Sequence, residues 1–207
     1  GNYLAITNTQ KSKRDIVKDI FKFKLNSATP LKVGVFDVAA EQNLDGLEKL
    51  LEMGSEIDFF DHHTQIQLPN GINDYSKTDS REISTASLAY SYFEEKHPEA
   101  TETEQKKAAH LAILGLANDG KHSGIKNFSS MIDEEEIEKL AYLGKVLNYS
   151  ANIGNTLDFR KILAQLLREQ NIIAYLGSDS QITSVSSEME SSIQELIPKI
   201  KKTEKGN

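Results

Sequence analysis

Short apolar runs alternate with a helical pattern in the first third of the chain. Apolar runs of strand length occupy residues 3–7, 31–39 and 57–60. Between the second and third runs, leucines recur at the spacing of one helical face, at Leu44, Leu47, Leu50 and Leu51. Asn43 is suited to cap this helix and Gly54 to end it. Strand, helix and strand within about thirty residues predict a right-handed βαβ unit with parallel strands.

The rest of the chain is predominantly helical in pattern. Residues 64–83, which contain Pro, Asn and Gly at positions 69–71, are expected to form a loop, as is the turn-rich stretch 117–124. Amphipathic helices are predicted at 14–24, 84–96, 103–116, 133–147, 157–169 and 181–202. The sequence therefore predicts an α/β fold: a parallel, doubly wound sheet flanked by helices, with a helical C-terminal part.

The amino-acid composition argues against some classes of binding partner. The 207 residues include 24 Lys plus Arg against 31 Asp plus Glu, a formal charge of −7, which argues against electrostatic capture of duplex DNA. Apolar runs stay far below the roughly 20 residues of a transmembrane helix, so no membrane partner is expected. The absence of cysteine excludes disulfides and thiolate zinc sites and fits a reducing cytoplasm.

Two aspartates come at the ends of predicted strands, positions that often carry ligand-binding or catalytic side chains. Asp37 and Asp61 each lie where a predicted parallel strand ends, so both carboxylates are expected at the same sheet edge. His62 and His63 extend the second strand, and strand alternation predicts that their rings point in opposite directions. One imidazole is then expected to bind a metal and the other to face a substrate oxygen, while Asp61 holds an imidazole by its second nitrogen.

Four segments together resemble the DHH phosphoesterase superfamily, including its exopolyphosphatase-related branch. They are VGVFDVA at 33–39, IDFFDHH at 57–63, STASLAY at 84–90 and AILGLANDG at 112–120. The resemblance implies hydrolysis of phosphodiester or phosphoanhydride bonds by two divalent ions, usually Mn²⁺. The implied substrates are a short single-stranded oligonucleotide, a cyclic dinucleotide or polyphosphate. A DHH-type domain at 1–150, incomplete at its N-terminus, is expected to precede a helical linker at 151–207.

The resemblance assigns roles to five residues. Asp37 matches the carboxylate that bridges two metals, His62 a ligand of the second metal, and Asp119 the carboxylate that completes that site. His63 matches the catalytic histidine that faces the substrate phosphate, and Asp61 its supporting carboxylate. Oxygen ligands with one imidazole favour Mn²⁺ or Mg²⁺ over Zn²⁺.

Other polar residues near these motifs have two interpretations. Ser84 and Thr85 are suited to orient a phosphate at a helix N-terminus, and equally to cap that helix. Arg81 and Lys121 can supply positive charge to a phosphate or form a solvated loop surface. His110, within a predicted helix, is expected to lie on the surface or to serve core packing.

Two parts of the family pattern are not found. No Asp-x-Asp occurs before the strand that ends at Asp37, and the glycine-rich segment of the family's second domain is absent. Three interpretations follow: a trimmed piece of a longer enzyme, a short member with a one-metal site, or a degenerate module that binds metal, phosphate or a partner without turnover. The spacing of Ile182, Met189 and Leu196 permits a homodimer through paired helices.

Overall fold

The computed structural model describes residues 3–7, 32–38, 40–63, 67–77, 81–153 and 157–204. The helix predicted at 14–24 lies outside these ranges. The chain divides into two compact units, residues 1–97 and 98–207. This division by compactness does not test the family-based boundary at residue 150, which stays a prediction.

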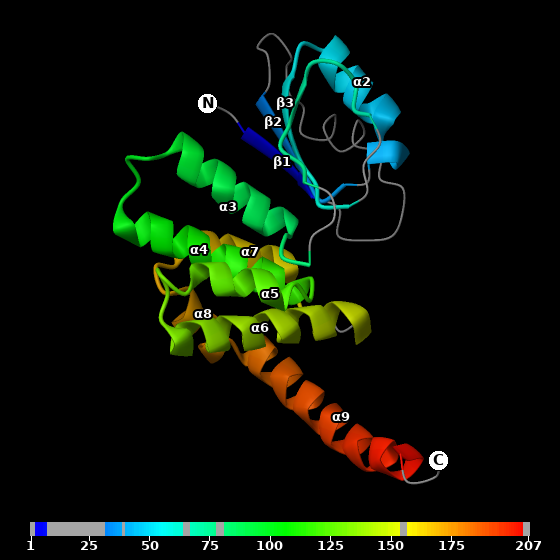
Figure 1. Ribbon diagram of the computed structural model, residues 1–207, viewed down its shortest axis with the longest axis vertical. Helices are drawn as coiled ribbons and strands as arrows, with labels where there is room; N and C mark the ends of the chain where they lie inside the picture. Colours follow the sequence, from blue (N-terminus) through cyan, green and yellow to red (C-terminus); the bar gives the residue numbers. More distant parts are fainter. Residues whose placement is uncertain are drawn as a thin grey trace. The chain divides into compact units, whose positions relative to one another are not determined.

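The first unit is built on a parallel sheet of four strands in the order β1-β2-β3-β4. Figure 1 shows β1, β2 and β3 side by side, with helix α2 beside them. The strand bounds are Tyr3–Thr7 for β1, Lys32–Phe36 for β2, Glu56–Phe60 for β3 and Ile72–Asp74 for β4. Between β2 and β3 lie a 3₁₀ turn, η1 (Ala40–Gln42), and α2 (Leu44–Glu52). The predicted parallel βαβ arrangement is therefore confirmed.

Helices lie on both faces of the sheet. Alternate residues of the two central strands, Val33, Val35, Ile57 and Phe59, are buried in one core with Leu47 and Leu50 of α2. On the other face, Phe60 stacks on Phe36 with ring centroids 4.8 Å apart and meets the edge of Tyr92 from α3 (Thr85–Lys96). Both faces of β3 are thus covered, as is typical of strands in parallel sheets.

The turn after α2 fixes where β3 begins. Gly54 has a φ of +77°, and its N–H donates to Leu51 while Ser55 N–H donates to Leu50. These two hydrogen bonds form a Schellman motif, which confirms the predicted glycine stop. Asn43 occupies the predicted N-cap position, although its side chain makes no capping hydrogen bond.

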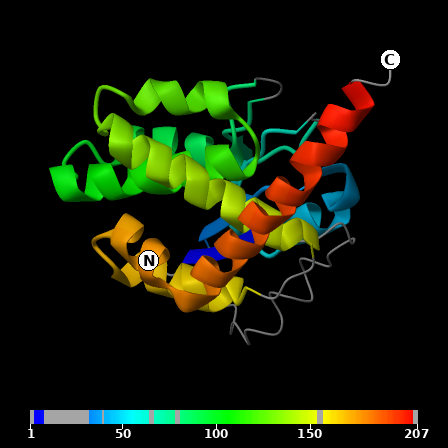
Figure 2. The same ribbon diagram turned by 90° about the horizontal axis from the view of Figure 1, so that it is seen from below.

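The second unit is helical in the residues that the structure describes. Its elements are α4 (Glu102–Asn118), α5 (His122–Ile125), η2 (Lys126–Phe128), α6 (Glu134–Ile153), α7 (Phe159–Arg168), α8 (Ile172–Ser178) and α9 (Ser180–Glu204). Helices α4 and α6 pack side by side (Figure 2). A Cβ at Gly144 would lie 2.6 Å from the Ala117 Cβ, so glycine permits this close approach. Within the described ranges, no helix is both long and apolar enough to cross a bilayer.

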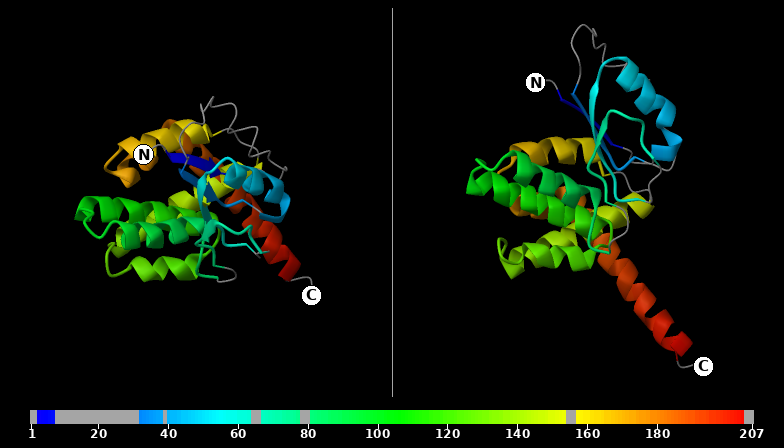
Figure 3. Two further views of the ribbon diagram at one scale, coloured as in Figure 1. Left: turned by 90° about the horizontal axis from the view of Figure 1, so that it is seen from above. Right: turned by 45° about the horizontal axis from the view of Figure 1, so that its top comes forward.

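Helix α9 has two different halves. Ile182, Val185 and Met189 in its first half are buried, whereas Ile193 and Leu196 are about half exposed. Figures 1 and 3 show its C-terminal end extending past the other helices of this unit. Ile182 and Met189 are therefore engaged within their own unit, and of the three residues proposed for helix pairing only Leu196 is exposed. The homodimer stays a prediction.

Candidate metal site at the carboxyl edge of the sheet

Asp37 directly follows β2 in an unusual backbone conformation. Its φ is 57°, and among the described residues it is the only non-glycine with a positive φ. Its N–H donates to the carbonyl of Phe60, the last residue of β3, over 3.0 Å. Left-handed backbone is unfavourable for residues with a Cβ, although Asp tolerates it better than most. The carboxylate is thus held at the strand end by a strained turn, a feature that often accompanies function.

Asp61 organises the residues that follow β3. Its side chain is 2% exposed, and its Oδ1 lies 2.7 Å from Nδ1 of His63 and accepts the His62 N–H at 2.9 Å. The Asp61 N–H in turn donates to Oγ of Ser76 at 3.1 Å. A buried carboxylate with these contacts fixes both the local backbone and the His63 ring. The role of Asp61 as the supporting carboxylate of a catalytic histidine stays a prediction.

The two histidines converge on Asp37. Nε2 of His62 lies 3.5 Å from the Asp37 Oδ1, and Nδ1 of His63 lies 3.7 Å from the same atom. One ligand atom from each of the three residues fits within 4.8 Å, a spacing that suits a single cation. The rings do not point to opposite sides as strand alternation predicted, because β3 ends at Phe60 and both histidines lie beyond the strand.

The surroundings of Asp37 favour its charged form. Its contact with the His62 imidazole is the main cause that holds the pKa of this carboxyl below its usual value. Partial burial opposes the effect, while the nearby His63 and the Thr85 hydroxyl reinforce it. Thr85 Oγ1 donates to Asp37 Oδ1 over 3.2 Å. An ionised carboxylate beside two imidazoles offers the oxygen and nitrogen donors that Mn²⁺ accepts.

Ser84 and Thr85 serve different local purposes. The Ser84 hydroxyl accepts from the Ser87 N–H and the Ser87 hydroxyl accepts from the Ser84 N–H, which forms a capping box at the start of α3. Thr85 instead contacts Asp37. Arg81 is exposed in the turn before α3. Substrate-binding roles for these three residues stay predictions.

Asp119 lies in the second unit, at the C-cap of α4. Gly120 N–H donates to Ala117 and Lys121 N–H donates to Leu116, with Gly120 at a φ of +69°. This Schellman motif accounts for the Asn-Asp-Gly sequence as a helix end. A metal-binding role for Asp119 stays a prediction.

Sequence reasoning missed a further buried carboxylate in the first unit. Asp58, in the middle of β3, is 5% exposed. It accepts from Asn73 Nδ2 at 2.9 Å and from the Tyr92 hydroxyl at 3.2 Å, and Lys32 Nζ lies 3.8 Å away. In the sequence, the only indication of this buried carboxylate is a single Asp within an apolar run. The contacts with β4 and α3 satisfy it, as buried charge requires.

Comparisons with protein-family models, curated proteins and solved structures find no match for this chain.

Proposed function

We propose that this chain is a metal-dependent phosphoesterase of the DHH type. It hydrolyses phosphodiester or phosphoanhydride bonds of a short single-stranded oligonucleotide, a cyclic dinucleotide or polyphosphate. The observation that carries the proposal is the convergence of Asp37, His62 and His63 at the carboxyl edge of a parallel sheet. Ligands of open α/β sheets bind at this edge.

The donor set fits a divalent ion such as Mn²⁺ or Mg²⁺. Asp37 supplies a carboxylate whose charged form is favoured, and His62 supplies Nε2 from a largely buried ring. A bound ion supplies Lewis acidity toward the phosphoryl group and the attacking water. Asp37 and His62 hold that ion, and Thr85 orients the Asp37 carboxylate through its hydroxyl.

His63 is proposed to meet the substrate phosphate. Its side chain is 56% exposed, and Asp61 engages the ring through Nδ1. Nε2 is then the nitrogen that exchanges a proton with the substrate or donates to a phosphoryl oxygen. The buried Asp61 carboxylate stabilises the imidazolium that forms when His63 takes up a proton.

In the family assignment Asp119 completes the same ion site as His62, and that role is part of the proposal. The doubly wound form of the sheet is part of the same proposal and is supported by the helices on both of its faces. A cytoplasmic location is also proposed, in keeping with a chain that contains no cysteine.

The alternative is a module that binds a metal or a phosphate without catalysis. One observation favours it: in the part of the chain that the structure describes, a single cluster of three ligand residues is found, and it contains one carboxylate. Two-metal hydrolysis requires a second ion about 3.5–4 Å from the first, with ligands of its own.

Titration calorimetry with Mn²⁺ tests the metal site. His62→Ala is expected to weaken Mn²⁺ binding by at least about tenfold, because it removes a ligand from a small donor set. His97→Ala is the matched control, since His97 is an exposed histidine at the end of α3. Equal affinity in the wild type and His62→Ala would contradict the ligand assignment.

An activity assay separates the two functions. The wild-type chain with Mn²⁺ is offered a dinucleotide, a cyclic dinucleotide, polyphosphate and pyrophosphate. Turnover that disappears in His62→Ala and persists in His97→Ala supports the phosphoesterase. Mn²⁺ binding without turnover of any of the four substrates supports the non-catalytic module.

A further inference from the structure

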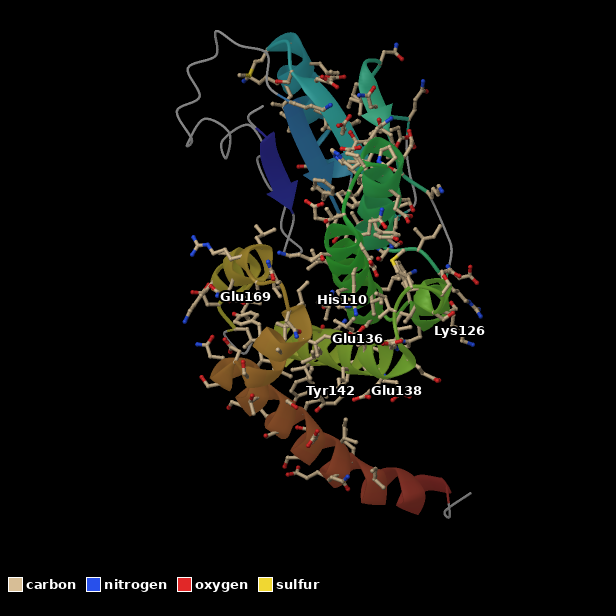
Figure 4. The ribbon with its side chains drawn as sticks, turned by 90° about the vertical axis from the view of Figure 1, so that its left-hand side faces the viewer. His110, Lys126, Glu136, Glu138, Tyr142 and Glu169 are labelled. Atoms are coloured by element: carbon tan, nitrogen blue, oxygen red, sulfur yellow. The ribbon has the colours of Figure 1, made fainter. Side chains whose placement is uncertain are left out.

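Strand β4 lies beside β3 and comes last in the described sheet of the first unit (Figure 4). Residues that pair between these two strands are 15 positions apart, as are Asp58 and Asn73. The pairing pattern continues after β4 ends, because Lys77 N–H donates to the carbonyl of Asp61 over 3.2 Å. In a parallel ladder, such a bond places the donor beside the residue that follows the acceptor. The backbone of Lys77 therefore lies next to that of His62.

Further hydrogen bonds fix the segment that carries Lys77. Asp61 N–H donates to Oγ of Ser76 at 3.1 Å, and Ser76 N–H donates to Oδ1 of Asp74 at 2.9 Å. Both backbone polar groups of Asp61 are thus bound to this segment. Because the Asp61 carboxylate lies 2.7 Å from Nδ1 of His63, one residue connects the Lys77 segment to the candidate metal site.

The strand order sets Lys77 at the border of that site. Asp37, His62 and Lys77 follow three neighbouring strands, β2, β3 and β4. Adjacent strands of a sheet are about 4.8 Å apart. The Lys77 backbone lies one strand beyond His62, on the side away from β2. On its flexible four-carbon stem, the ammonium group can approach the cluster without being part of it.

The charge of Lys77 is available for a ligand. Its side chain is exposed and has no ion pair with any residue that the structure describes. Asp37 and Asp61 bring two carboxylates to the candidate site, and one divalent ion balances their formal charges. A substrate with several phosphate groups then meets no net positive charge from these groups and the ion. Lys77 supplies a cation one strand away, which favours a polyanion.

We propose that Lys77 binds a phosphate group adjacent to the one that is hydrolysed, so that the preferred substrate carries at least two phosphates. The inference rests on the proposed phosphoesterase, in which His63 meets the reacting phosphate. An ammonium group donates charge-assisted hydrogen bonds to phosphate oxygens. An oligonucleotide with a terminal phosphate and polyphosphate share this chemistry, whereas a dinucleotide with one internal phosphate lacks the second group.

Calorimetry with ligands that resist hydrolysis tests this role of Lys77 without relying on turnover. Two pairs of ligands are compared in the presence of Mn²⁺. One pair is a dinucleotide with a phosphorothioate linkage, with and without a terminal phosphate, and the other is imidodiphosphate and inorganic phosphate. Lys77→Gln is expected to weaken binding of the two-phosphate member of at least one pair by about tenfold, because a hydrogen bond to a charged group is lost. Binding of the one-phosphate member should be unchanged, and the pair that responds distinguishes an oligonucleotide from polyphosphate.

Control variants separate this role from a structural one. Lys77→Arg keeps the charge and is expected to retain the wild-type preference for two phosphates. Lys49→Gln is the matched control, since Lys49 is an exposed lysine in the last turn of α2, and it should bind all four ligands as the wild type does. Mn²⁺ affinity should be equal in the wild type and Lys77→Gln, because an ammonium group is not a metal ligand. A loss of Mn²⁺ affinity would show that Lys77 supports the metal site and would overturn its role toward substrate.

Three binding results would also overturn the role of Lys77. They are the absence of binding by all four ligands to the wild-type chain, unchanged binding in Lys77→Gln, and a loss that is equal for both members of each pair. Failure of the proposed hydrolysis is a separate result. A wild-type chain that binds two-phosphate ligands through Lys77 but turns over no substrate keeps the Lys77 site and rejects the phosphoesterase. Turnover together with unchanged binding in Lys77→Gln does the reverse.

Discussion

Nδ1 of His63 lies 2.7 Å from Oδ1 of Asp61, a carboxylate whose side chain is 2% exposed while that of His63 is 56% exposed. The pair therefore joins a buried carboxylate to a solvent-accessible imidazole. The same Oδ1 accepts the backbone N–H of His62, so Asp61 fixes the position of both histidines. The orientation of the two rings toward Asp37 depends on this residue.

Asp61→Asn is expected to weaken Mn²⁺ binding by about 10–100-fold, the usual cost of losing a group that orients a metal ligand. The amide retains one oxygen acceptor but loses the charge and places an N–H₂ group where the second oxygen lay. Calorimetry measures the effect. Asp45→Asn, an exposed change in the first turn of α2, is expected to leave affinity unaltered. Equal affinities for the two variants would refute an orienting role.

The positive φ of Asp37 leads to a prediction about stability. Asp37→Gly and Asp37→Ala both remove the carboxylate, but only glycine adopts this backbone without strain. Allowing for the greater freedom of glycine in the unfolded chain, we expect Asp37→Gly to have a free energy of unfolding about 0.5–1 kcal/mol above that of Asp37→Ala. Urea denaturation without metal provides the measurement. A more stable alanine variant would show that the backbone is unstrained there.

Ser84 and Thr85 are adjacent, yet different effects are expected from their removal. Ser84→Ala deletes the capping hydroxyl of α3 and should lower the free energy of unfolding by about 1 kcal/mol. Thr85→Val keeps the shape but removes the hydrogen bond to Asp37. It should weaken Mn²⁺ binding by a few-fold and spare the cap. Urea denaturation and calorimetry on both variants separate the two roles, and a reversed pattern would contradict the assignment.

The sequence predicted the parts of the fold that depend on local patterns. The apolar runs before Asp37 and Asp61 form adjacent parallel strands, because each is short, bounded and separated by an amphipathic helix. Gly54 ends that helix through backbone freedom that only glycine supplies readily. Placing Asp37 and Asp61 at one sheet edge needed no further information.

Other features depend on contacts that no local pattern shows. Strand β4 is three residues long and is defined by its pairing with β3, so residues 72–74 were predicted as loop. Helix α8 is seven residues long and too short to show a clear period. The burial of Asp58 depends on Asn73 and Tyr92, which lie 15 and 34 positions away. The convergence of His62 and His63 occurs beyond the end of β3, where strand alternation no longer applies.

His110 allows a prediction about pH that does not depend on any ligand. Its pKa lies below the usual 6.5 because of burial; nearby Glu136 opposes this shift and Lys106 adds to it. Between these two pKa values the unfolded chain binds a proton that the folded chain does not, so the free energy of unfolding falls as pH decreases below about 6.5. His110→Leu lacks this contribution from proton binding. Its free energy of unfolding relative to that of the wild type should therefore increase as the pH is lowered from about 7.5 to about 5.5. His97→Leu, which alters an exposed histidine, is measured alongside as the comparison variant. Urea denaturation at several pH values measures the difference, and identical slopes for His110→Leu and the wild type would show that His110 takes up its proton equally in both states.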